Sequence, residues 1–321
     1  MVDPLIASRA VHFAASLVVA GVAIFSAIIR GVSRTTSRAV KRQDWLMLAA
    51  LVVAVLSGAA WLLFLAANIA QSTVTAAIGD GTTWGVLTDT QFGRVWIARL
   101  LVAMLLFCIW LVGTPTQGLH SLTLLQALLA VIFVGTLAWS GHAAGTTGLG
   151  GIIHFANDAS HLIAAGAWVG GLIPLLLFLS PRVRGLEPPL DECYGVLRRF
   201  STLAAWSVTA LALSGLVNTW YMTDGLQNFL GTEYGDLVLV KVALFIVMLA
   251  FGAANRYWLT PRLLAAAKGG TLRLLCTSIS VEILLGLVVI CVVAVLGELE
   301  PPGHMHHMDM TVGGRSNLNQ G

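Results

Sequence analysis

Long apolar runs separated by short polar connections dominate this chain. Eight of the runs reach about 20 mostly apolar residues, the length that a helix needs to cross the hydrocarbon core of a bilayer. They lie at residues 5–29, 44–69, 92–113, 120–140, 152–179, 200–222, 237–257 and 274–297. Backbone groups in lipid must hydrogen-bond within their own segment, and no run alternates like the strand of a membrane barrel. The pattern therefore predicts eight transmembrane helices.

Composition supports a membrane protein. Of the 321 residues, 57% are hydrophobic and only 10% are charged, whereas a soluble domain carries about 25% charged residues. A water-soluble fold must cover its surface with polar groups, and this chain has too few of them. We therefore expect an all-α integral membrane protein in which residues 1–297 form an eight-helix transmembrane domain and residues 298–321 form a polar tail.

Lys and Arg residues are divided unequally between the two sets of connections. Thirteen of the eighteen fall on one side of the predicted topology. The other side has Arg9, Arg94, Arg99, Lys241 and Arg315. Positively charged loops stay in the cytoplasm, so eight spans place both termini on the periplasmic side of a bacterial inner membrane. The net charge of +3 is small and forms no basic stripe, so we do not expect a nucleic-acid partner.

The fifth run carries the sharpest chemical signal. His154, Asp158 and His161 are spaced at i, i+4 and i+7, which places them on one face of a helix. Two imidazoles and a carboxylate are suitable ligands for a divalent transition metal. Asp158 has a second potential role, in which it orients one imidazole from the outer shell. Small residues follow in the sequence at 164–166 and 170–171, and they predict close packing against a neighbouring helix.

Two further histidines are predicted at a similar depth. His142 lies where the fourth run ends, and His12 lies one to two turns inside the first run. Ionisable groups within a membrane indicate a functional site by default. We therefore predict a metal site at the periplasmic end, formed by His154, Asp158 and His161 with His142, and with His12 as a further candidate ligand. The alternative that the sequence leaves open is structural hydrogen bonding.

The tail gives a second metal signal. Residues 303–310 read GHMHHMDM. Thioethers favour Cu(I), imidazole suits both copper ions and zinc, and His-rich tracts are typical of metal binding. The methionines favour copper. The alternative is a solvated tail of chance composition. The candidate ligands are His304, Met305, His306, His307, Met308 and Met310.

Four other charged residues fall within or next to apolar runs. Arg94, Arg99 and Lys241 lie toward the periplasmic ends. They either extend to the lipid headgroups or provide a counter-charge for Asp158. Glu282 lies deep in the last run, where it serves a proton or ion relay or hydrogen-bonds a neighbour. The sequence does not separate these roles.

Several stretches resemble the CopD family of bacterial copper-resistance and copper-uptake membrane proteins. The most specific are SGHAAG at 140–145 and DASHLIAAGAWVGGL at 158–172. The others are FSTLAAWSVTALALSGLVNTW at 200–220, YGDLVLVK at 234–241 and GAANRYWLTPRL at 252–263. The resemblance implies an eight-helix inner-membrane protein that acts with a periplasmic copper-binding partner of the CopC type, here on a separate chain.

Three functions from different classes follow from these observations. The first is a copper permease or transfer protein that takes copper from the periplasmic side. The second is a membrane haem electron carrier, because paired histidines on neighbouring helices can bind haem. The third is a copper sensor or assembly factor that binds copper without moving it. No nucleophile elbow, phosphate-binding loop or dinucleotide fingerprint occurs, so we do not expect an enzyme.

Overall fold

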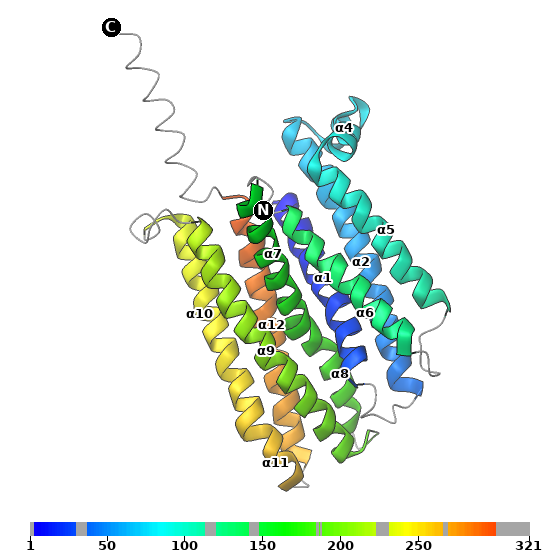
Figure 1. Ribbon diagram of the computed structural model, residues 1–321, viewed down its shortest axis with the longest axis vertical. Helices are drawn as coiled ribbons and strands as arrows, with labels where there is room; N and C mark the ends of the chain where they lie inside the picture. The colour runs from blue at the N-terminus through cyan, green and yellow to red at the C-terminus, as the bar shows by residue number, and fades with distance from the viewer. Residues whose placement is uncertain are drawn as a thin grey trace.

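A computed structural model describes residues 3–29, 37–112, 120–140, 148–183, 186, 188–222, 231–265 and 269–299. All regular secondary structure in these ranges is helical (Figure 1). Eight of the helical segments are long and apolar enough to cross a membrane. The fold class predicted from the hydropathy pattern is therefore confirmed.

Five of the eight crossings are single helices and three are composite. The single helices are α1 (Pro4–Ile29), α2 (Ser37–Ile69), α5 (Gln91–Val112), α9 (Leu190–Met222) and α12 (Gly269–Leu296). The composite crossings are α6 (His120–Gly135) with η1 (Thr136–Ser140), α7 (Gly148–Ala165) with η3 (Gly166–Gly170) and α8 (Gly171–Val183), and α10 (Glu233–Ala254) with η5 (Asn255–Leu259) and α11 (Thr260–Ala265).

Two short helices cap one end of the bundle. These are α3 (Val74–Gly79) and α4 (Thr82–Asp89). We call the end of the bundle where they lie the α4 end, and the opposite end the α11 end (Figure 1). Thr73 caps α3 by accepting a hydrogen bond from Ala76 N at 3.3 Å. Gly81 has a φ of 84°, a left-handed conformation that glycine adopts without steric cost. Asp80 accepts a hydrogen bond from Thr82 N, which lowers the pKa of the Asp80 carboxyl.

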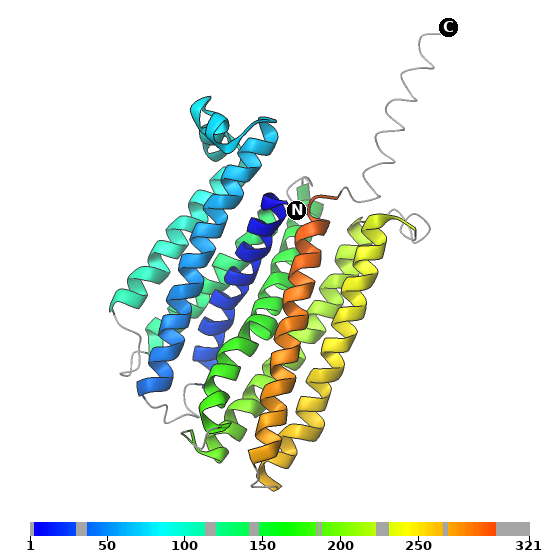
Figure 2. The ribbon, with the colours of Figure 1, turned by 180° about the vertical axis from the view of Figure 1, so that it is seen from behind.

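Helix α1 lies at the centre of the bundle. It packs against α2 and α6 on one side and against α8, η3 and α12 on the other (Figure 2). A Cβ at Gly21 would collide with the backbone of Gly170, and one at Gly170 would collide with the carbonyl of Leu17. The backbones of α1 and η3 therefore touch, which confirms the close packing predicted from the small residues of the fifth run.

The first and last crossings are also joined by charge. Arg9 Nη2 lies 2.6 Å from Glu298 Oε1, just beyond the end of α12. Arg9 Nη1 donates to the carbonyl of Ala294 at 3.3 Å. The guanidinium stands 5.2 Å from the ring centroid of Trp61 on α2. Arg9 therefore connects three helices at the α4 end.

Two crossings contain a π-helical turn, and each turn precedes a proline. Segment η3 ends at Gly170, the residue four positions before Pro174. Segment η5 includes Tyr257, four positions before Pro261. A proline has no N–H for the carbonyl four residues earlier, and its ring clashes with that carbonyl. A wider turn accommodates this defect, and such turns are frequent at functional sites.

Candidate functional site

His154 and Asp158 lie side by side on α7 near the α4 end. His154 Nε2 lies 3.7 Å from Asp158 Oδ2, and both side chains are largely shielded from solvent. The i, i+4 spacing places them one above the other on the helix surface. This is the contact that the predicted site required between an imidazole and the carboxylate.

His161 lies two turns farther along the same face. Seven residues of helix rise about 10 Å, which is too far for His154 and His161 to hold one ion together. Asp158 lies between the two imidazoles. Among the described residues, no group of three His, Cys, Asp or Glu side chains is close enough to hold a metal ion. The face therefore has an imidazole–carboxylate contact, between His154 and Asp158, with His161 farther along the helix.

A hydrogen bond to α9 sets the orientation of His161. Its Nδ1 lies 2.8 Å from Ser214 Oγ, and that hydroxyl donates to the carbonyl of Ala210 at 2.6 Å. The single hydroxyl proton is used by Ala210, so His161 Nδ1 carries the proton shared with Ser214. Nε2 then keeps its lone pair, and such second-shell contacts are how proteins prepare an imidazole for a metal.

Two asparagines extend this polar contact between α7 and α9. Asn157 Nδ2 donates to the carbonyl of Ser214 at 3.1 Å and also to Asn218 Oδ1. Asn157, Ser214 and Asn218 did not enter the predicted site. Two signals in the sequence could have identified them. All three are polar residues within apolar runs, and Ser214 and Asn218 are spaced i, i+4 on one face of the sixth span.

A large apolar cavity lies beside His161. Its volume is about 450 Å³, and it is bounded by residues of α1, α7, η3, α9, α10 and α12. His161 and Lys241 provide its ionisable lining. The Lys241 ammonium interacts electrostatically with both Asp158 and His161. Of the two predicted roles of Lys241, the structure agrees with a counter-charge for Asp158.

His12 belongs to a different network. The side chain is completely buried on α1. Its Nδ1 lies 2.8 Å from the carbonyl of Ala54, and its Nε2 lies 3.0 Å from Arg99 Nη2. Because the guanidinium always donates, Nε2 accepts and Nδ1 carries the proton. A metal at His12 would have to displace one of these two hydrogen bonds.

Arg99 does not extend to the headgroups, as one prediction had it, and is not the counter-charge of Asp158. It is only 3% exposed. Nη1 donates to the carbonyl of Phe133 and to Thr136 Oγ1, and Nη2 also donates to Ser16 Oγ at 3.1 Å. These polar acceptors, together with the Phe133 ring at 4.2 Å, let a cation stay inside the bundle.

The remaining candidate ligands lie outside the described residues. They are His142 and the tail residues His304, Met305, His306, His307, Met308 and Met310. The first residue of the predicted tail is Glu298, and it pairs with Arg9 of α1. The start of the tail therefore lies beside α1.

Comparison with known proteins identifies related sequences over most of the chain. The family profile described as Copper resistance protein D matches residues 194–296, and the profile described as Copper resistance protein D-like, N-terminal domain, matches residues 1–152. The chain is 29% identical to the Inner membrane protein YebZ of Escherichia coli, over 92% of this chain and 98% of YebZ. It is 28% identical to Copper resistance protein D of Pseudomonas syringae pv. tomato, over 94% of this chain and 98% of that protein.

A third relative matches over a shorter stretch. The Copper transport protein CutJ of Bacillus subtilis is 31% identical over 56% of this chain and 33% of CutJ. No solved structure matches the chain.

Proposed function

Because this chain belongs to the copper resistance protein D family, we propose that it binds copper at the α4 end of its bundle and passes it across the bacterial inner membrane. It is a multi-pass inner-membrane protein with a role in copper homeostasis. The α4 end faces the periplasm in this proposal, in agreement with the excess of Lys and Arg on the other side.

The observation that carries the proposal is the position of Asp158 between two imidazoles on one face of α7. His154 lies 3.7 Å from its carboxylate, and His161 lines the adjoining cavity. In this proposal His154 and Asp158 first hold the copper ion, with His142 as a third ligand. The ion then moves along the helix when His161 replaces the other imidazoles and Asp158 stays bound. Nε2 of His161 is the atom that receives it, because Nδ1 is held by Ser214.

The ligand types are compatible with copper in both oxidation states. Imidazole and carboxylate without a thiolate suit Cu(II), and the methionines of the tail suit Cu(I). We infer that the tail collects copper, alone or from a CopC-type periplasmic protein, and delivers it to the α4 end. Only neutral imidazole binds a metal ion, so protonation of the histidines at low pH should release copper from the site.

Copper titration of the protein lacking residues 303–321 tests the site. Wild-type sequence should bind copper inside the bundle, and His161→Ala should lower the affinity at least tenfold, while His12→Asn should leave it unchanged in the folded fraction. Equal affinity and stoichiometry in the His161→Ala protein would overturn the site.

Copper flux into sealed vesicles tests the transport step. A protein that binds copper at this site and moves none would be a copper sensor or assembly factor. A visible absorption spectrum of the purified protein tests the haem carrier, which would show the bands of a ligated haem.

A further inference from the structure

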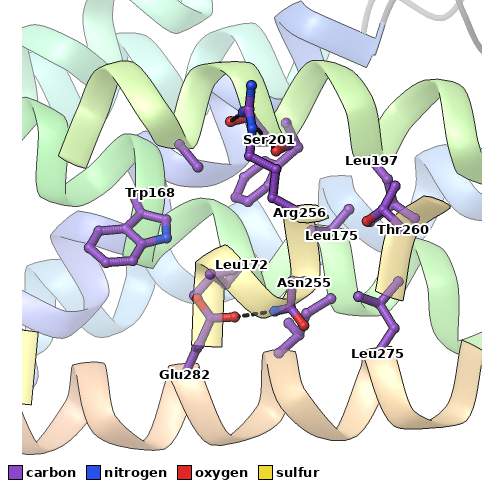
Figure 3. A pocket seen from close by; sticks show the side chains of 14 residues that line it. Trp168, Leu172, Leu175, Leu197, Ser201, Asn255, Arg256, Thr260, Leu275 and Glu282 are labelled. Carbon is purple, nitrogen blue, oxygen red and sulfur yellow. Dashed lines mark hydrogen bonds between the residues drawn. The ribbon is translucent and has the colours of Figure 1, made fainter. Parts of the chain in front are cut away.

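A second, smaller cavity lies deeper in the bundle, toward the α11 end. Its volume is about 50 Å³, which is enough for water. Trp168 of η3 lines this cavity as well as the large one. Both π-helical turns meet here, since η5 contributes Asn255 and Arg256 to the same wall (Figure 3). The two irregular turns therefore converge on one small cavity.

Glu282 of α12 is the central polar group of this cavity. It is 1% exposed, and its Oε1 accepts a hydrogen bond of 2.5 Å from Asn255 Nδ2 (Figure 3). Its Oε2 faces Gly252, where a Cβ would stand 3.6 Å away. Within the described part of the chain, no Lys, Arg or His forms a salt bridge with Glu282.

The nearest cation is directed elsewhere. Arg256 lines the cavity, but its Nη1 donates to the carbonyl and to the hydroxyl of Ser201, at 2.7 and 2.9 Å. Helices α8, α9, α10 and α11 and the turn η3 contribute no ionisable side chain to the described lining. Asn255 Oδ1 is buried with no hydrogen-bond donor among the described residues. The cavity thus contains one carboxyl group, that of Glu282, and one buried acceptor, Asn255 Oδ1, to which no described residue donates a hydrogen bond.

We propose that Glu282 and Asn255 form a proton-binding site in the interior of the bundle, distinct from the metal site at the α4 end. An isolated ionised carboxylate is very costly to bury, and a bound proton removes the charge. The proton passes from water in the cavity to Oε2 and returns to water when the site empties. Oε1 keeps the hydrogen bond from Asn255 in both states.

A proton fits this site better than a metal ion does. Copper prefers imidazole, thiolate and thioether ligands, and the cavity lining has none of them. Hard cations such as Ca²⁺ take six to eight oxygen ligands, whereas Glu282, Asn255, Ser201 and Thr260 are the described side chains that carry oxygen here. The proposal does not depend on copper crossing the membrane, so the two proposals can fail separately.

Infrared spectroscopy of the full-length protein tests the proposal without copper. A protonated carboxyl group has its own carbonyl-stretch band, which disappears on ionisation. We expect the wild-type protein to show such a band, to lose it reversibly at high pH, and to lack it in Glu282→Gln. Glu298→Gln, which changes a more exposed carboxylate paired with Arg9, is the matched control and should keep the band.

The hydrogen bond from Asn255 provides a second readout. Asn255→Leu removes the donor to Oε1, so the band should move to higher frequency without disappearing, a change that a purely structural role would not produce. This variant keeps the proposal testable if Glu282→Gln does not fold. The absence of a titrating band in the wild-type protein, or an unchanged band in folded Glu282→Gln, would overturn the proposal.

Discussion

His12 Nε2 accepts a hydrogen bond of 3.0 Å from Arg99 Nη2 in the interior of the bundle. This contact ties α1 to α5, and Arg99 also reaches the carbonyl of Phe133 on α6. Trp96 stands edge-on to the imidazole, with ring centroids 5.1 Å apart. Arg99 and His12 therefore join helices α1, α5 and α6. From the sequence alone, a buried arginine and a buried histidine would both indicate a functional site.

Replacing Arg99 tests this structural role. Arg99→Leu leaves His12 Nε2 without its donor and removes the hydrogen bond to Ser16 Oγ, which should lower the free energy of unfolding by about 2–3 kcal/mol. Copper affinity of the tail-deleted protein should stay unchanged. Arg94→Leu, at an exposed position of the same helix, is the control and should change stability by no more than about 0.5 kcal/mol. A loss of copper affinity in folded Arg99→Leu would place the His12 network in the metal site.

Asp158→Asn separates the two roles predicted for the carboxylate. Asparagine keeps the shape but removes the charge. If Asp158 binds copper directly, the affinity of the tail-deleted protein should fall at least a hundredfold. If it only orients His154, the loss should be closer to tenfold, which is typical of an outer-shell contact. Isothermal titration gives both values, and an unchanged affinity would exclude Asp158 from the site.

Lys241 should weaken the binding of divalent copper. Its ammonium interacts with Asp158 and His161, so it opposes a second cation in the same place. Lys241→Gln is expected to raise Cu(II) affinity severalfold and to make binding less sensitive to salt. Arg94→Gln is the charge-matched control. A lower affinity in Lys241→Gln would mean that the ammonium is needed to hold Asp158 in position.

Deletion of residues 303–321 tests the tail. Copper accumulation should fall at low external copper and recover at high copper, because the bundle site is retained and only the collecting segment is lost. The deleted protein should melt at the same temperature as the full chain. Equal accumulation across the whole concentration range would show that the tail has no part in copper capture.

The topology prediction can be tested independently of copper. A reporter that is active only in the periplasm should be active when it is fused after residue 310, and a reporter that requires the cytoplasm should be inactive there. The matched fusion is one in the first connection, near residue 34, where the outcome should be reversed. A cytoplasmic tail would remove the basis for periplasmic copper collection.

The eight crossings were predictable because lipid requires long apolar helices and the chain has no other long apolar runs. The ends were harder to predict. Helix α9 begins at Leu190, ten residues before the predicted start, because Asp191, Glu192 and Arg198 lie outside the apolar run that defined the prediction. Acidic residues are favourable in a first helical turn, and this signal was available. Helices α3 and α4 were missed because their apolar runs are short.

The site was predictable along one helix but not between helices. The spacing of His154 and Asp158 predicted their contact. Nothing in the spacing of His161 predicted Ser214, and nothing near Arg99 in the sequence predicted His12, since those pairs are 53 and 87 residues apart. Periodicity describes one helix face, whereas such pairs depend on how helices pack.

The central position of α1 has a consequence for biosynthesis. This helix leaves the ribosome before the seven other described crossings, yet it packs against α12, the last of these eight to be made. Until α12 is inserted, Arg9 lacks its partner Glu298. The contacts between α1 and α12 can therefore form only after the crossings between them have been made, and we expect a chain that stops before residue 298 to leave α1 incompletely packed.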